Sequence, residues 1–164
     1  MFEYLRKYNK ILVTGPQRSG TRIAAKAIAL DTGYTYIDEK EFKVSNLNQL
    51  REILKKDKIV IQCPGVSAWI QKFSSEDTLI IFMKRDTEDI LASQKRINWQ
   101  QKTEVSKYNR SGGIICLIKY DEWERQQRPI IKHWLELEYE SLAKHPLWIP
   151  KEKRLNFKAR QTKL

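Results

Sequence analysis

Short apolar runs alternate along the first half of the chain with segments whose apolar residues recur at helical spacing. Runs that are apolar on almost every residue indicate strands buried on both faces of a sheet. The predicted strands are Lys10–Thr14, Thr35–Ile37, Lys58–Gln62 and Thr78–Met83. The predicted helices between them are Ile23–Ala29 and Asn46–Lys56. Strands that alternate with helices predict an α/β fold in three layers, with a mostly parallel central sheet and helices on both faces.

The second half of the chain is more helical. We expect helices at Asp86–Trp99 and at Tyr120–Trp134, the second with a kink or a new start at Pro129. Asp86 stands near the N-terminus of the first of these helices, where an acidic residue suits the helix dipole. Leu135–Tyr139 alternates apolar and acidic residues, which predicts an edge strand of the sheet.

Length and charge narrow the range of partners. The 164 residues suit one domain, and we expect residues 1–164 to form it, with a basic tail at about 151–164. Lys and Arg outnumber Asp and Glu by 31 to 20, which gives a net charge of +11. This excess attracts anions, a class that includes nucleotides, sulfated or phosphorylated acceptors, nucleic acid and acidic lipid.

Targeting and redox signals predict a cytoplasmic protein. Cys63 and Cys116 stand in apolar stretches without a Cys-x-x-Cys pair, as buried reduced thiols do. The charged N-terminus lacks the apolar region of a signal peptide. The longest apolar run, Leu79–Met83, is far too short to cross a bilayer, so we expect no membrane span.

The residues that follow the predicted strands are the first candidates for a site, because ligands of parallel sheets bind beyond the carboxyl ends of the strands. The segment after the first strand, "GPQRSGTR", is a glycine loop that leads into a helix. Backbone N–H groups in such a loop, and the start of the helix, favour an anion. Ser19 and Thr21 add hydroxyl groups, and Arg18 and Arg22 add charges that suit phosphate or sulfate oxygens. We therefore predict that this loop binds the phosphate end of a nucleotide.

The spacing Gly15-x-x-x-x-Gly20 matches the first part of a Walker A loop, but the next two residues do not. A Walker A loop continues with Lys, which reaches the β- and γ-phosphates, and with Ser or Thr, which holds Mg²⁺. Thr21 and Arg22 occupy these two positions. We therefore expect no metal at this loop.

The loop resembles the 5′-phosphosulfate loop of the sulfotransferases that use 3′-phosphoadenosine 5′-phosphosulfate, which typically reads Pro-Lys/Arg-Ser-Gly-Thr-Thr. The segment from Arg18 to Thr21 matches this pattern, and Arg22 replaces the second threonine. Arg85 and Ser93, eight positions apart, have the order and spacing of the Arg and Ser that bind the 3′-phosphate in that family. "HWLELEYESLAKHP" is similar to a late tryptophan-containing helix, strand and "YEDL" segment, with Tyr139 as its tyrosine.

The resemblance implies a P-loop-like fold and the transfer of a sulfuryl group from 3′-phosphoadenosine 5′-phosphosulfate to an unknown hydroxyl or amine acceptor. The implied product ligand is 3′-phosphoadenosine 5′-phosphate. The residues that would bind the donor are Gly15, Arg18, Ser19, Gly20, Thr21, Arg22, Arg85 and Ser93. Arg18, Arg22 and the loop amides would stabilise the charge that develops during transfer.

The general base is the point at which the chain departs from the family. Many cytosolic members place a Lys and a catalytic His on the strand where this chain has Val60 and Gln62. Four residues remain as candidates for the base, namely Asp38, Glu39, His133 and His145. Asp38 and Glu39 follow a strand end, so they could face the pocket. We predict a catalytic set of Arg18, Arg22 and Asp38.

Two other classes stay open. A P-loop nucleotide kinase or small-molecule kinase would share the strand, loop and helix, with Asp86 as a possible metal ligand, and would need Mg²⁺ and ATP. A non-catalytic nucleotide-binding protein, or a basic module for nucleic acid, would use the net charge and the tail. Nucleic acid is not favoured, because the tail offers only Phe157 as an aromatic residue.

Overall fold

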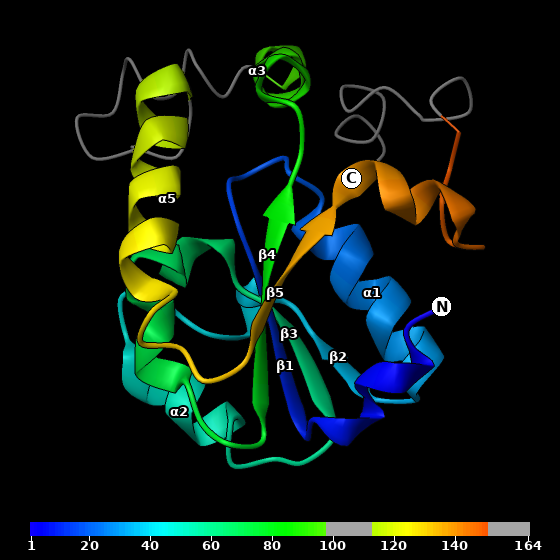
Figure 1. Ribbon diagram of the computed structural model, residues 1–164, viewed down its shortest axis with the longest axis vertical. Helices are drawn as coiled ribbons and strands as arrows, with labels where there is room; N and C mark the ends of the chain where they lie inside the picture. Colours follow the sequence, from blue (N-terminus) through cyan, green and yellow to red (C-terminus); the bar gives the residue numbers. More distant parts are fainter. Residues whose placement is uncertain (98–112, 151–164) are drawn as a thin grey trace.

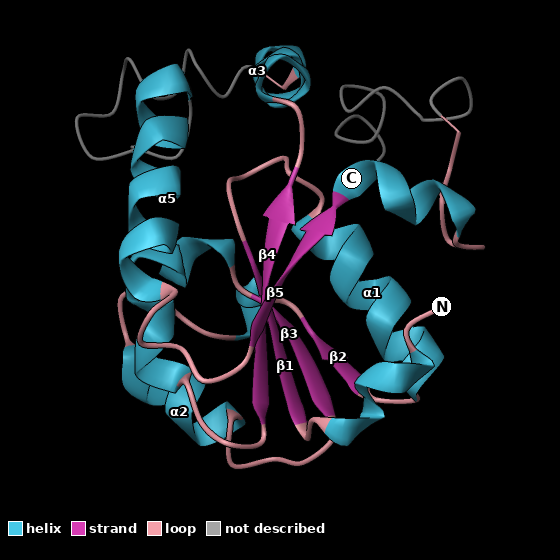
Figure 2. Cartoon of the chain, in the orientation of Figure 1, coloured by secondary structure: helices cyan, strands magenta, loops and turns pink. Residues whose placement is uncertain are grey.

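A computed structural model describes residues 1–97 and 113–150, and the predicted basic tail and the predicted helix end at Trp99 lie outside these ranges. The described strands form one five-stranded sheet in the order β2-β3-β1-β4-β5, and each neighbouring pair is parallel. The strands are β1 (Lys10–Thr14), β2 (Thr35–Ile37), β3 (Ile59–Gln62), β4 (Thr78–Lys84) and β5 (Trp134–Glu138). Helices cover both faces, which confirms the predicted three-layer α/β fold (Figure 1, Figure 2).

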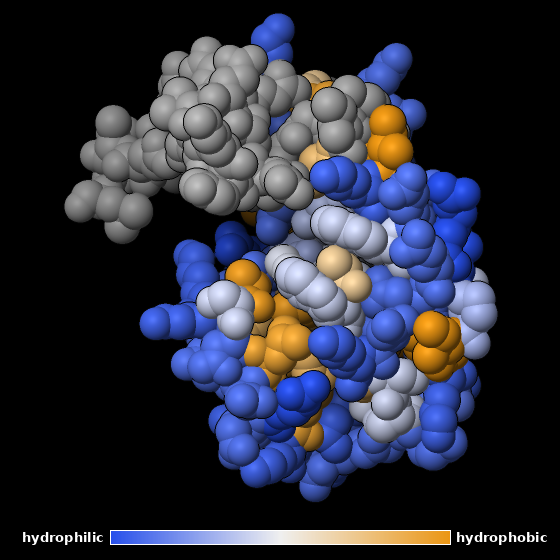
Figure 3. Space-filling view, turned by 90° about the vertical axis from the view of Figure 1, so that its left-hand side faces the viewer, coloured by the Kyte–Doolittle hydropathy of each residue, from blue (hydrophilic) through white to orange (hydrophobic). Residues whose placement is uncertain are grey.

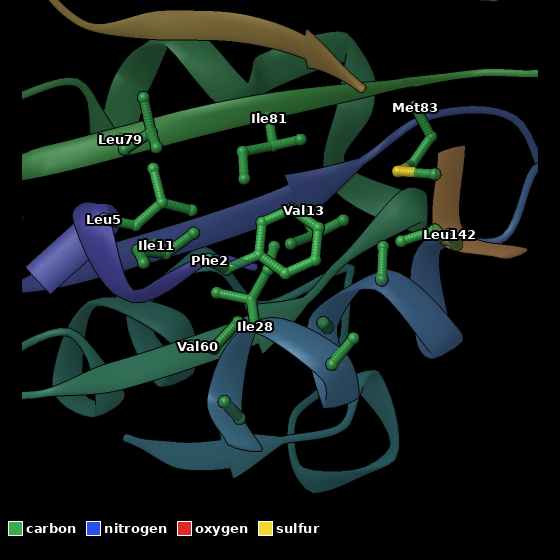
Figure 4. Close-up of a cluster of buried hydrophobic side chains, with 14 of the residues drawn as sticks. Phe2, Leu5, Ile11, Val13, Ile28, Val60, Leu79, Ile81, Met83 and Leu142 are labelled. Atoms are coloured by element: carbon green, nitrogen blue, oxygen red, sulfur yellow. The ribbon is translucent and has the colours of Figure 1, made fainter. Parts of the chain in front are cut away.

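One face of the sheet is covered by α1 (Thr21–Thr32) together with the 3₁₀ helices η1 (Glu3–Lys7) and η4 (Tyr139–Lys144). Alternate residues of the strands point toward these helices, as the two-residue period of a strand requires. Figure 4 shows the resulting cluster. Its fully buried members include Leu5, Ile11, Val13, Ile28, Val60 and Ile81. Each such side chain contributes about 1.5–3 kcal/mol relative to an exposed one, so this cluster holds α1 firmly behind the loop that precedes it.

The other face is covered by α2 (Leu47–Ile53) and the 3₁₀ helix η3 (Pro64–Phe73). The intervening strand residues form a second buried cluster with them, including Leu12, Leu50, Ile61, Ile70 and Ile80. A further helix, α5 (Gly113–Gln127), packs on η3. Gln127 joins the two, because its Nε2 donates to Ser67 O at 2.7 Å and its Oε1 accepts from Gln71 N at 2.9 Å.

The predicted helix over Tyr120–Trp134 is wrong in its limits. The helix there, α5, begins earlier and ends at Gln127, and Trp134 is the first residue of β5. Pro129 therefore neither kinks a helix nor begins one, since it lies in the turn that follows α5. Proline has no N–H to donate and disfavours helical backbone in the residue before it, so the helix ends ahead of it. The predicted edge strand is confirmed, one residue earlier than expected.

The helix α3 (Thr87–Arg96) follows β4 at the carboxyl edge of the sheet (Figure 1). Asp86 is its N-cap, and Asp86 Oδ1 accepts hydrogen bonds from the N–H groups of Glu88 at 2.9 Å and Asp89 at 3.3 Å. The predicted position of Asp86 at a helix N-terminus is thus confirmed.

Hydrophilic residues dominate the surface that Figure 3 shows, with smaller apolar areas among them. Within residues 1–97 and 113–150, no helix combines the length and the apolar character that a membrane span requires.

Candidate functional site

The glycine loop lies at the carboxyl end of β1, the central strand of the sheet, and leads into α1. Gly15 has φ of +144°, and Gly20, the N-cap of α1, has φ of +95°. Arg18 also has a positive φ, of +73°, which is uncommon for a residue with a side chain. Ser19 is buried, and its Oγ donates to Pro16 O at 2.6 Å, so its hydroxyl closes the loop on itself.

Tyr139, which is far from the loop in the sequence, packs against it in the structure. A Cβ atom on Gly20 would lie 2.4 Å from Tyr139 Cδ2 and 2.8 Å from Tyr139 Cε2. The ring of Tyr139 also lies under the guanidinium of Arg85, with 4.1 Å between Arg85 Cζ and the ring centroid. Tyr139 therefore holds together the loop and the end of β4, an arrangement that its sequence motif did not reveal.

The structure brings together three of the residues that the sequence predicts for donor binding. Arg18 Nε donates to Ser93 Oγ at 2.9 Å, and Arg85 Nη1 donates to the carbonyl of Arg18 at 2.8 Å. Burial lowers the pKa of Arg18, and the positive charges of Arg85 and Arg96 lower it further. The loop is thus a region where several guanidinium groups repel one another, and a bound anion would relieve that repulsion.

A second pair of predicted residues, Arg22 and Asp38, meets on the other side of the loop. Arg22 Nε lies 3.1 Å from Asp38 Oδ2, which also accepts a hydrogen bond from Tyr36 Oη at 2.7 Å. Asp38 Oδ1 accepts from Lys40 N at 3.0 Å, so both carboxylate oxygens have donors. Burial raises the pKa of Asp38, but the hydrogen bonds from Tyr36, Lys40 and Arg22 outweigh it, and the net shift is downward. Asp38 thus holds Arg22 and the start of the 3₁₀ helix η2 (Glu39–Glu41) in place.

Gln62 is a link that sequence reasoning missed. This buried residue ends β3, which lies between β2 and β1 in the sheet. Its Nε2 donates to Thr21 Oγ1 at 3.1 Å, and its Oε1 accepts from Glu39 N at 3.3 Å. One amide therefore connects the start of α1 to the segment after β2. The sequence signal was its place at the end of a buried strand, but the pattern did not reveal its two partners.

Two pockets flank the loop. Gly15 and Pro16 line a cavity of about 170 Å³ on the β4 side, together with Ser67, Lys84, Tyr120 and Glu124. Gln17 and Arg22 line a larger cavity of about 500 Å³ on the β2 and β3 side, together with Asp38, Glu39, Lys43 and Gln62. The loop thus has a cavity on each side, which suits a reaction in which one ligand passes a group to another across it.

The histidines predicted as possible bases line neither pocket. His133 precedes β5 and therefore lies at the edge of the sheet opposite the loop, where its ring contacts Tyr8 with 5.3 Å between centroids. His145 is buried beyond η4, and its Nε2 lies 3.0 Å from Asp31 Oδ1. These positions leave Asp38 and Glu39 as the sequence-predicted acids and bases beside the loop.

Among the comparisons with known proteins, only the comparison of three-dimensional structures finds similar proteins. No protein-family model matches the sequence, and no curated protein matches it. A solved shikimate kinase from Acinetobacter baumannii in complex with shikimate has a TM-score of 0.58 at 15% identity, over 87% of this chain and 93% of that one. The chain has a P-loop fold.

Two further solved structures share this P-loop fold. Shikimate kinase from Bacteroides thetaiotaomicron has a TM-score of 0.55 at 15% identity, over 78% of this chain and 86% of that one. YorR protein from Bacillus subtilis, in complex with phosphorylated GDP, has a TM-score of 0.50 at 12% identity, over 80% of this chain and 86% of that one. At such identities the likeness extends to the fold, and the chemistry has to be argued from the residues of the site.

Proposed function

We propose that the chain transfers a phosphoryl group from a nucleoside triphosphate to a small hydroxylated acceptor, as small-molecule kinases with this fold do. The observation that carries the proposal is the loop with a cavity on each side, at the carboxyl edge of the sheet. The loop amides and guanidinium groups provide the anion site, and the larger cavity provides room for an acceptor. The fold shared with two shikimate kinases and with a protein bound to phosphorylated GDP supports the same class.

The loop arginines take over the role that a Walker A lysine has elsewhere. Thr21, at the lysine position, is buried and hydrogen-bonded to Gln62, so it does not extend toward a phosphate chain. Arg18 and Arg22 flank it and supply the positive charges. In-line transfer of a phosphoryl group depends mainly on positioning and on electrostatic stabilisation, and guanidinium groups provide both.

The Mg²⁺ that kinases ordinarily use does not fit the residues of this loop. The position of the metal-binding hydroxyl is held by Arg22, whose guanidinium repels a cation and pairs with Asp38. The nearest acid after β4, Asp86, is engaged in capping α3. The proposed reaction therefore runs on the side chains of the protein, and donor binding should persist in EDTA.

A second candidate function, sulfuryl transfer from 3′-phosphoadenosine 5′-phosphosulfate, is favoured by the surroundings of Arg85. The two residues that the resemblance implies for the 3′-phosphate, Arg85 and Ser93, both contact Arg18 of the loop, through its carbonyl and its Nε respectively. Arg85 Nε is buried and finds no hydrogen-bond acceptor within the described residues. A buried donor without an acceptor costs about 1–3 kcal/mol, and an oxygen of a 3′-phosphate would satisfy it.

Calorimetric titration with four ligands separates the two functions. The ligands are ATP with Mg²⁺, ATP with EDTA, 3′-phosphoadenosine 5′-phosphate and AMP. Phosphoryl transfer predicts binding of ATP in both buffers, with weaker binding of AMP. Sulfuryl transfer predicts that 3′-phosphoadenosine 5′-phosphate binds best, and ATP poorly.

The matched control is Arg51→Ala, which removes an exposed arginine of α2 remote from the loop. Binding of ATP that is lost in Arg18→Ala and kept in Arg51→Ala would support the site. Absence of binding for all four ligands would refute both functions. An obligatory Mg²⁺ between the loop and Asp86 would contradict the expected independence from metal.

A further inference from the structure

Glu39 lines the larger pocket, and one of its two carboxylate oxygens is held by a hydrogen bond from the main chain. It is the first residue of η2, half-buried, and its Oε2 accepts a hydrogen bond from Gly65 N at 2.9 Å. Its Oε1 accepts no hydrogen bond from the described residues, and the carboxylate lies so close to Gly65 that a Cβ there would be 2.6 Å from Oε1. The main chain of Gly65 thus fixes the carboxylate against one wall of the pocket.

The distance between Glu39 and the phosphate loop is set by Gln62. The Gln62 side chain bonds Thr21 Oγ1 at the loop and the N–H of Glu39 at the pocket. Gln62 also stands at the position where the resembled sulfotransferases carry a catalytic histidine. The amide of Gln62 cannot take up a proton at neutral pH, but it anchors the main chain of Glu39, whose carboxylate lines the adjoining pocket.

The neighbouring acid, Asp38, differs from Glu39 in its hydrogen bonds and in the direction of its pKa shift. Both Asp38 oxygens accept hydrogen bonds, from Arg22, Tyr36 and the Lys40 N–H, and these bonds keep its pKa low. Burial raises the pKa of Glu39, and the nearby charge of Asp38 raises it further against the lowering effects of the Gly65 N–H and Arg22. A base with a raised pKa removes a proton from a hydroxyl more readily than one with a low pKa.

The titratable groups that face Glu39 come from several elements. Arg22 projects from α1 and Asp38 precedes η2. Two further titratable groups lie near Glu39, namely the thiol of Cys63 after β3 and the phenol of Tyr120 on α5. Burial raises the pKa of both groups, and the negative charge of Glu39 raises both further. Both groups therefore stay neutral in the range where a carboxylate titrates, so an acid limb that is lost on removal of the Glu39 carboxylate, and that does not arise from the γ-phosphate of ATP, would belong to Glu39.

From this arrangement we infer that Glu39 is a catalytic residue, the general base that accepts the proton of an acceptor hydroxyl bound in the pocket on the β2 and β3 side. The inference rests on the proposed phosphoryl transfer. The hydroxyl oxygen forms a bond to the γ-phosphorus of the nucleoside triphosphate, and its proton passes to Glu39 Oε1. The bond from that phosphorus to the bridging oxygen breaks, and its electron pair leaves with the nucleoside diphosphate. The protonated carboxyl group then returns the proton to solvent.

The test uses water as the acceptor, so that no other acceptor has to be known. The full chain is mixed with [γ-³²P]ATP, and release of phosphate is followed across pH 4 to 9 alongside ATP affinity by calorimetry. In Glu39→Gln the amide oxygen can still accept from the Gly65 N–H, so the fold and ATP affinity should be kept. Phosphate release should fall about 100-fold or more, the usual scale for a general base. The part of the acid limb that belongs to Glu39 should disappear from the pH profile, and the part that belongs to the γ-phosphate of ATP should remain.

Two variants complete the design. Glu39→Asp should recover part of the rate together with an acid limb, and Glu52→Gln, at an exposed residue of α2, should match the wild type. Unchanged phosphate release in a folded Glu39→Gln that binds ATP would overturn the role of Glu39 and leave the proposed function intact. Failure of the wild-type chain to bind ATP would overturn both.

A measurement on the wild-type protein covers the case in which Glu39→Gln does not fold. With ¹³C-labelled glutamate carboxyl groups, one resonance should titrate above the ordinary range and move higher when ATP is added, because the triphosphate brings negative charge to the adjacent loop. A spectrum in which ATP changes no glutamate titration would overturn the inference without any variant.

Discussion

Gly20 offers a sharp test of how the loop is held, because an added methyl group there meets two separate obstacles. The backbone of Gly20 has φ of +95°, a conformation that residues with side chains rarely adopt. The added Cβ would also lie 2.4 Å from the ring of Tyr139, well inside the contact distance of two carbon atoms. Gly20→Ala should therefore destabilise the protein and displace the loop from the geometry that we propose for anion binding.

The two costs can be separated with Gly33, the C-cap of α1. Its φ of +76° is also left-handed, but a Cβ on Gly33 would meet no atom within 4 Å. An alanine in left-handed backbone costs about 1–2 kcal/mol, and this is the whole cost expected for Gly33→Ala. The overpacking against Tyr139 adds about 1–3 kcal/mol. We therefore expect Gly20→Ala to lose about 2–5 kcal/mol of unfolding free energy.

Urea denaturation followed by circular dichroism measures both losses. A double-mutant cycle then tests the contact directly: removal of the ring in Gly20→Ala/Tyr139→Ala should make the combined loss smaller than the sum of the single losses by about 1–3 kcal/mol. If Gly20→Ala loses no more than Gly33→Ala, or if the two substitutions are additive, Tyr139 does not brace the loop and the reasoning fails.

Three further predictions follow from single contacts. Arg18→Ala should weaken nucleotide binding by roughly 1.5–3 kcal/mol, the scale of hydrogen bonds to charged groups, and unchanged affinity in calorimetry would remove Arg18 from the site. Arg85→Ala should reduce affinity for 3′-phosphoadenosine 5′-phosphate much more than for AMP, whereas equal losses would mark a structural role. Hydrogen bonds from Ser75 and Lys10 lower the pKa of Asp77 to about 2, so its ionised form stabilises the fold above about pH 4, and this contribution is lost as the pH falls through 2. Asp77→Asn should therefore lower the urea midpoint at pH 7 and much less at pH 2, and an equal difference at both pH values would contradict this.

The sequence was sufficient for features that depend on neighbouring residues. The strand at Lys10–Thr14 and the loop after it were predicted with the limits that the structure shows for the strand. Both are local patterns: a run of apolar residues, then glycines where the backbone must turn. The placement of Arg85 and Ser93 beside the loop was expected from their spacing in a resembled family and not from the residues themselves, and the hydrogen bond from Arg18 to Ser93 was not predicted.

Features that depend on the order of the strands in the sheet could not be predicted from the sequence. The link from Gln62 to Thr21 and Glu39 exists because β3 lies between β2 and β1, and no local pattern encodes that order. The contact of Tyr139 with Gly20 likewise requires β5 to lie beside β4 and to end at the same edge. The 3₁₀ helix η3 was missed because its proline and glycine read as the end of a strand.

The bridge made by Gln62 affects any attempt to redesign the selectivity of this protein. The single side-chain amide of Gln62 contacts both the start of α1 at the glycine loop and the main chain of Glu39. Substitution of Gln62 should therefore alter the affinities for the proposed nucleotide and the proposed acceptor at once, and would confound a screen for new acceptors. Lys43 and Ser45 line the larger pocket, on the β2 and β3 side of the glycine loop. Among the described residues, the structure shows no hydrogen bond between either side chain and that loop. Under the proposed phosphoryl transfer, libraries at these two residues should change the acceptor preference with little effect on donor affinity.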